Sequence, residues 1–206
     1  MEEGRLANVS AALLVGGASS RMGGDKARLE LAGEPAATRL ARRLAALCEE
    51  VLLVGGDPPE GAPGRRVADV EGPRCALRGL VSALGAARSE RVLVVATDLP
   101  LVSEALLLAL VAWPEADAVV ARDAQGPQAL CGVYRRAPAQ AVAARRLADG
   151  RRLALRGLLD ELDTRVLPED VLRAVDPDGD ALHNVNTPED LARAEARLGA
   201  AAARRR

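Results

Sequence analysis

Residues 9–29 read VSAALLVGGASSRMGGDKARL and join a short apolar run to a glycine-rich loop. The run 9–15 is typical of a buried strand in a sheet that is covered on both faces. The loop holds four glycines in nine residues, which allows backbone conformations closed to other residues and lets amide N–H groups turn toward an anion. This junction predicts an α/β fold with a ligand site at the carboxyl end of the strand.

Lys26, at the end of this loop, is the only lysine of the chain, whereas the other 27 basic residues are arginines. An arginine would serve equally well at a solvated position, so a lone lysine indicates a compact positive charge beside a phosphate. Arg21 adds a second cation to the loop. We interpret the loop as a cradle for a triphosphate; the alternative is a flexible connection between strand and helix. It is neither a Walker loop nor a dinucleotide fingerprint, because Ala27 follows the lysine and G-x-G-x-x-G is missing.

Apolar runs bounded by turn residues recur along the chain and alternate with segments of helical spacing through about residue 112. This alternation predicts a single α/β domain with a mostly parallel central sheet and helices on both faces. The predicted strands are 9–15, 51–56, 67–69, 91–98, 118–122, 128–134 and 164–167, and the predicted helices are 35–48, 76–87, 103–112, 138–148, 153–161 and one from about 188. We expect an ordered core over about 9–198 and a flexible tail over 199–206.

Composition narrows the classes of function. The chain has 206 residues and a net charge of −1, which argues against a nucleic-acid-binding surface. No apolar stretch approaches the roughly 20 residues of a membrane-spanning helix, and the acidic N-terminus is unlike a secretory signal. Three widely spaced cysteines and one histidine do not match a zinc site, and we expect reduced thiols in a cytoplasmic protein.

Polar segments come at the ends of three of the predicted strands: the glycine loop after the first, Asp69 at the end of the third, and TDLP (97–100), which contains Asp98, at the end of the strand 91–98. The carboxyl ends of parallel strands meet at one edge of a sheet, so we expect these segments to converge on one crevice.

The loop in its context, LLVGGASSRMGGDKARLEL (13–31), resembles the signature L-x-G-G-x-S-x-R-M-G-x-D-K of the molybdenum cofactor guanylyltransferases, which are nucleotidyltransferases with a Rossmann-like fold. VVATDLPLV (94–102) resembles the family's metal-binding segment, RRVADVEGP (65–73) its acidic segment, and HNVNTPEDLARAEARL (183–198) its carboxyl-terminal signature. The similar segments together reach from about residue 9 to 198. The resemblance implies that GMP is transferred from GTP to the terminal phosphate of molybdopterin cofactor and that pyrophosphate is released.

The resemblance also implies roles for individual residues. It assigns nucleotide binding to residues at the predicted strand ends and in the loop: Leu14, Val15, Gly16, Gly17, Lys26, Asp69 and Asp98. It assigns catalysis to Arg21, Lys26 and Asp98, with Asp98 binding Mg²⁺, and it places Asn184 and Asn186 where the acceptor and the phosphates meet. Magnesium typically takes one or two carboxylates plus phosphate oxygens, so one aspartate after a buried strand suits it. A capping or turn role is the alternative for Asp98.

The segment NVNTPEDL (184–191) supports two interpretations that hold together. Thr187 as N-cap and Pro188 as the first helical residue predict a helix start. The chain has only three asparagines, and Asn184 and Asn186 are two of them. Neutral amides orient phosphates or metal-bound water without adding charge, so we expect these two asparagines to lie at the site.

Two departures from the family pattern affect the prediction of which nucleotide base the chain binds. In EGPRCALRGL (71–80), Arg78 stands where a small residue is usual, and a polar residue that contacts the base in many members is replaced by Val54 or Gly55. The expectation of guanine therefore rests on Gly16 and Gly17, because relatives that use CTP tend to have L-x-A-G in this turn.

Three alternatives stay open: a cytidylyltransferase for the same cofactor, a transferase for a different phosphorylated metabolite, and a non-catalytic nucleotide-binding protein that regulates a partner or delivers the cofactor to it. Arg151 and Arg152 either contact the acceptor phosphate or begin a solvated helix. We expect GTP and molybdopterin cofactor as ligands, with a cofactor-synthesis protein or molybdoenzyme as a possible protein partner and no nucleic acid or membrane.

Overall fold

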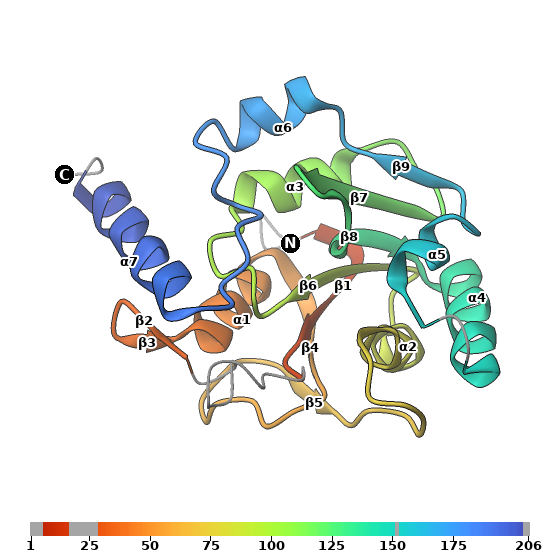
Figure 1. The fold of residues 1–206 in the computed structure, drawn as a ribbon. Helices are drawn as coiled ribbons and strands as arrows, with labels where there is room; N and C mark the ends of the chain where they lie inside the picture. The colour runs from red at the N-terminus through yellow and green to blue at the C-terminus, as the bar shows by residue number, and fades with distance from the viewer. Residues whose placement is uncertain (1–5, 17–28, 151–152, 204–206) are drawn as a thin grey trace.

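The computed structural model describes residues 6–16, 29–150 and 153–203 (Figure 1). Its central sheet has seven strands in the order β5-β4-β1-β6-β8-β7-β9. The strands are β1 (Leu6–Leu14), β4 (Cys48–Val54), β5 (Arg65–Val67), β6 (Arg91–Ala96), β7 (Ala118–Asp123), β8 (Gly126–Arg135) and β9 (Thr164–Val166). β8 runs antiparallel to β6 and β7, and the other pairings of this sheet are parallel. The prediction of a mostly parallel sheet is confirmed.

Helices cover both faces of this sheet (Figure 1). On one face lie α1 (Ala36–Leu47), α3 (Glu104–Ala112) and α6 (Glu169–Val175), and on the other lie α2 (Ala76–Ala86), α4 (Arg136–Asp149) and α5 (Leu155–Leu159). Successive strand side chains point to opposite faces of the sheet. Leu13 therefore packs into the apolar cluster on the face of α1, α3 and α6, and Leu14 packs into the cluster on the face of α2, α4 and α5. Two buried apolar layers therefore fix the sheet between the helices, as the sequence predicted.

A third, smaller apolar cluster anchors the last helix of the chain. α7 (Pro188–Ala203) contacts a short hairpin formed by β2 (Glu30–Leu31) and β3 (Glu34–Pro35). Leu31, Ala36, Val185 and Ala194 are the buried members of this cluster. Packing of the hairpin and α7 brings the carboxyl-terminal signature segment back toward the sheet.

Most predicted elements are present, with shifted ends and two omissions. The third strand was predicted over 67–69, but β5 ends at Val67 and leaves Asp69 in a loop. The β2–β3 hairpin and α6 were not predicted. The predicted helix 103–112 corresponds to α3, and Ser103 caps it, because its hydroxyl accepts a hydrogen bond from the Leu106 N–H at 3.1 Å. Among the helices of the described ranges, none has both the length and the apolar character needed to cross a membrane.

Glu50, in β4, forms a polar cluster near the amino edge of the sheet. Its carboxylate accepts hydrogen bonds from the Ser10 hydroxyl at 2.7 Å, the Arg88 backbone N–H at 2.8 Å and the Arg65 guanidinium at 3.0 Å. Burial raises the pKa of the carboxyl, but these hydrogen bonds and the charge of Arg65 outweigh it and leave the pKa of Glu50 below its ordinary value. The charged form of Glu50 therefore stabilises the fold.

We expect Glu50→Gln to lower the free energy of unfolding by about 1.5–3 kcal/mol near neutral pH, because hydrogen bonds to a charged group are lost. The pKa of Glu50 is lower in the folded chain, so this stabilisation is complete above the unfolded value of about 4.3 and is lost as pH falls through the folded pKa. Urea unfolding at neutral and acidic pH measures the effect, with exposed Glu115→Gln as control. A difference in unfolding free energy between Glu50→Gln and the wild-type chain that stays constant down to about pH 3 would contradict the stabilising role of the charged Glu50.

Candidate functional site

The end of β1 is held on both sides at the carboxyl edge of the sheet. The Val15 backbone N–H donates to the Val54 carbonyl oxygen at 2.9 Å. On the other side, the backbone N–H and the hydroxyl of buried Thr97 both donate to the Leu14 carbonyl oxygen at 3.2 Å. These contacts fix the point at which the glycine loop leaves the sheet. The sequence placed Thr97 at this edge as part of the segment 97–100, but it did not predict the hydrogen bonds of Thr97 with Leu14.

Gly16 is the first residue of the predicted phosphate loop and lies against the chain that follows β4. A Cβ atom at Gly16 would lie 3.1 Å from the Gly56 backbone nitrogen, so a side chain here would force the two segments apart. Gly17, Arg21 and Lys26 lie outside the described residues. Their assigned roles stay predictions, and Gly16 marks where the loop begins.

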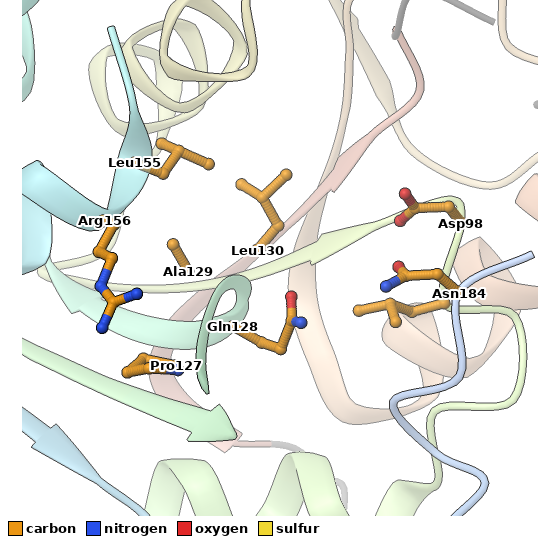
Figure 2. Close-up of a pocket in the computed structure, with 9 residues that line it drawn as sticks. Asp98, Pro127, Gln128, Ala129, Leu130, Leu155, Arg156 and Asn184 are labelled. Atoms are coloured by element: carbon orange, nitrogen blue, oxygen red, sulfur yellow. The ribbon is translucent and has the colours of Figure 1, made fainter. Parts of the chain in front are cut away.

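Asp98 and Asn184 come together at the end of β6. The Val185 backbone N–H donates to the Asp98 carbonyl oxygen at 2.8 Å and holds the segment before α7 beside this strand end. Both residues line a cavity of about 190 Å³ (Figure 2). Asn186 lies two residues further on, where its backbone N–H donates to the Asp190 carboxylate at 3.0 Å. One carboxylate and one amide therefore share a wall of this cavity.

The opposite wall of the cavity comes from β8 and α5. Figure 2 shows Arg156 of α5 across from Asp98 and Asn184, with Gln128 of β8 between them. The pairing of β8 with β7 is irregular at this point. Such irregularities re-aim side chains and are frequent beside active sites. The sequence did not identify Gln128 or Arg156, because the register of two strands is not visible in the sequence of one.

The helix start predicted in NVNTPEDL is confirmed. The Thr187 hydroxyl accepts a hydrogen bond from the Asp190 N–H at 3.1 Å, and the Asp190 carboxylate accepts from the N–H groups of Asn186 and Thr187 at 3.0 Å each. This reciprocal arrangement is a capping box. The hydrogen bond from the Asn186 N–H is the largest cause that lowers the pKa of Asp190. The cap fixes the approach of Asn184 to the cavity.

Asp69 lies at a different part of the same edge. It follows β5, whereas Asp98 follows β6, and β4 and β1 lie between these strands. The Asp69 carboxylate accepts a hydrogen bond from Arg78 of α2 at 2.7 Å. The structure therefore brings Asp98 and Asn184 into one cavity and places Asp69 on the other flank of β1, beyond the origin of the glycine loop.

Cys48 and Cys131 do not add a nucleophile to this edge. Cys48 and Cys131 are buried, and burial raises the pKa of Cys48 to about 11 and that of Cys131 to about 12. Both thiols are protonated at neutral pH and are poor nucleophiles. The described residues also contain no group of three or more His, Cys, Asp or Glu side chains placed to hold a metal.

Comparisons with known proteins give a consistent family. A family model described as a MobA-like NTP transferase domain matches residues 11–166. A probable molybdenum cofactor guanylyltransferase of Chloroflexus aggregans is 37% identical over 201 residues, which cover 93% of this chain and 95% of the relative. A molybdenum cofactor guanylyltransferase of Desulfosudis oleivorans is 31% identical over 197 residues, covering 93% and 96%. The crystal structure of molybdopterin-guanine dinucleotide biosynthesis protein A from Archaeoglobus fulgidus matches with a TM-score of 0.77 and 24% identity, covering 92% of this chain and 98% of that chain.

Proposed function

This chain belongs to the MobA-like NTP transferase domain family, and we propose that it transfers GMP from GTP to the terminal phosphate of molybdopterin cofactor and releases pyrophosphate. The names of its relatives support the coarser statement that it is a nucleotidyltransferase of molybdenum cofactor biosynthesis. The observation that carries the proposal is the cavity at the end of β6, where Asp98 and Asn184 meet.

The proposed reaction needs positioning and charge neutralisation more than a protein nucleophile. The terminal phosphate of the acceptor attacks the α-phosphorus of GTP, a new phosphorus–oxygen bond forms, and pyrophosphate leaves. An ionised acceptor phosphate needs no strong base. Arg21 and Lys26 in the glycine loop would offset repulsion between the two anions, and Asn184 and Asn186 would orient phosphate oxygens through neutral amides.

The donor set of the cavity fits magnesium. The Asp98 carboxylate and the Asn184 amide oxygen are hard ligands on one wall, and magnesium typically takes one or two carboxylates and completes its shell with phosphate oxygens and water. Magnesium bound at Asp98 would offset charge on the phosphates of the nucleotide. We therefore propose Asp98 as the magnesium ligand.

The far wall of the cavity suits the acceptor. Arg156 supplies a guanidinium opposite Asp98, and Gln128 supplies an amide between them (Figure 2). A guanidinium binds phosphate oxygens through two parallel hydrogen bonds, so we place the acceptor phosphate on this side. Arg151 and Arg152 lie outside the described residues, and their proposed contact with the same phosphate stays a prediction.

A transfer assay tests the proposed function. The chain is incubated with magnesium, molybdopterin cofactor and GTP, CTP or ATP, and both pyrophosphate and the dinucleotide product are measured. Of the three nucleotides, we expect only GTP to give the dinucleotide product. Product with CTP alone would replace the guanylyltransferase by a cytidylyltransferase. GTP binding without pyrophosphate release in the presence of acceptor would favour the non-catalytic delivery protein.

A further inference from the structure

Arg78 lies in the first turn of α2 and faces Asp69 across the loop that follows β5. One of its terminal nitrogens donates to Asp69 Oδ2 at 2.7 Å, and the other donates to the Gly72 carbonyl oxygen at 3.3 Å. The side chains of Arg78 and Asp69 are only 20% and 21% exposed. A cation in the first turn opposes the positive end of the helix dipole. Helix formation therefore does not account for an arginine at this position.

Asp69 is also confined on its other sides. A Cβ atom at Gly55 would lie 3.0 Å from both carboxylate oxygens of Asp69, and the φ of Gly55 is +68°, where glycine is favoured. A Cβ atom at Gly79, one residue after Arg78, would lie 4.0 Å from Asp69 Oδ1 and 3.6 Å from Leu14 Cδ1. The Asp69 carboxylate is therefore held between Gly55 and α2, close to the end of β1.

The guanidinium of Arg78 is not fully satisfied by these contacts. Its Nε is buried and has no hydrogen-bond partner within the part of the chain that the structure describes. A buried donor without a partner costs free energy and calls for an explanation. A first-turn cation with an unpartnered buried donor breaks two local preferences at once, and such departures are expected at functional sites.

We propose that Arg78 is a positioning residue for the nucleoside end of the bound nucleotide: it fixes the Asp69 carboxylate, which accepts hydrogen bonds from the nucleoside. The inference rests on the proposed function, because it takes this edge of the sheet as the nucleotide site. A carboxylate repels a triphosphate, so the groups that Asp69 accepts are neutral donors, either an amine of the base or a ribose hydroxyl. Arg78 matters to binding because a carboxylate already held in place loses less conformational entropy when the nucleotide binds.

The test compares GTP with inorganic tripolyphosphate, which has no nucleoside. Arg78→Met keeps an apolar stem and removes the ion pair. We expect the Kd for GTP, measured by calorimetry with magnesium, to rise about tenfold, while the Kd for tripolyphosphate is unchanged. Arg78→Lys keeps the charge and should recover part of the loss. Arg135→Met is the matched control, because it removes an ion pair with Asp117 at the opposite edge of the sheet.

Two further measurements separate positioning from general stability. Asp69→Asn should weaken GTP binding to a similar degree, and the double variant should bind GTP no more weakly than either single variant, because both changes act through one carboxylate. Inosine triphosphate lacks the base amine and 2′-deoxy-GTP lacks one ribose hydroxyl. The analogue whose Kd does not respond to Arg78→Met identifies the donor.

Two results would overturn the inference and leave the proposed function intact: GTP affinity of Arg78→Met within about twofold of the wild-type value, or equal weakening of GTP and tripolyphosphate. Should Arg78→Met fail to fold in thermal unfolding, Arg78→Lys carries the test and must raise the Kd for GTP but not for tripolyphosphate. A wild-type chain that binds no nucleotide and transfers none overturns the proposed function itself.

Discussion

Asp98→Asn is expected to lower turnover about 1,000-fold, which is the order expected when a charge-stabilising group is lost at a reacting centre. The change keeps the shape of the side chain but removes the negative charge of the carboxylate, which we propose as the magnesium ligand. The backbone contact with Val185 uses the Asp98 carbonyl oxygen, so the segment before α7 should stay in place. The rate of guanine dinucleotide formation at saturating GTP measures the effect.

Asp163→Asn is the matched control for this experiment. Asp163 is exposed just before β9, at the opposite edge of the sheet, and pairs with Arg165. We expect wild-type turnover from this variant. Raising the magnesium concentration should recover part of the Asp98→Asn rate, because weaker metal binding responds to mass action. Wild-type turnover in Asp98→Asn would rule out Asp98 as the metal ligand.

Lys26→Ala is expected to lower kcat/KM for GTP by about 100-fold or more, since a positive charge beside the developing charge of the phosphates is lost. Lys26→Arg should restore little of this activity, because a planar guanidinium does not replace a compact ammonium at a crowded phosphate. Steady-state kinetics with varied GTP measures both variants. Activity of Lys26→Ala within about twofold of wild type would contradict the interpretation of the loop as a triphosphate cradle.

The uniqueness of Lys26 offers a second, independent readout. An amine-reactive reagent modifies Lys26 and the terminal amine, because the chain has no other lysine. We expect GTP to protect Lys26 from modification, with the terminal amine as the internal control in the same sample. Equal modification of Lys26 with and without GTP would show that the lysine does not lie against the nucleotide.

The alternation of apolar runs was enough to predict the architecture, because β1, β4 and β6 each contain an apolar run, at 11–14, 51–54 and 92–96, that needs helices on both faces. Short elements were harder. α6 has no fully buried residue, and β2 and β3 have two residues each, so none of the three gives a periodic hydrophobic pattern in the sequence. The end of β5 was misplaced by two residues, because hydrogen bonding to β4 and not the sequence pattern ends that strand at Val67.

The candidate site was predictable where function depends on residues that directly follow a strand. Asp98 follows the most apolar strand, and the rarity of asparagine drew attention to Asn184, which the structure places in the same cavity. Gln128 and Arg156 were missed, because an irregular strand pairing and the docking of a short helix bring them to the cavity. Arg78 was recognised only as a departure from a family pattern, and its ion pair with Asp69 depends on how α2 packs against the sheet.

The fate of the α-phosphate tests the central claim most directly. GTP labelled at the α-phosphate and GTP labelled at the γ-phosphate are incubated in parallel with the chain, magnesium and molybdopterin cofactor. Nucleotidyl transfer predicts that the α label enters the guanine dinucleotide and that the γ label leaves as pyrophosphate. Release of the γ label as orthophosphate, with the α label left in GDP, would contradict nucleotidyl transfer and show hydrolysis in its place.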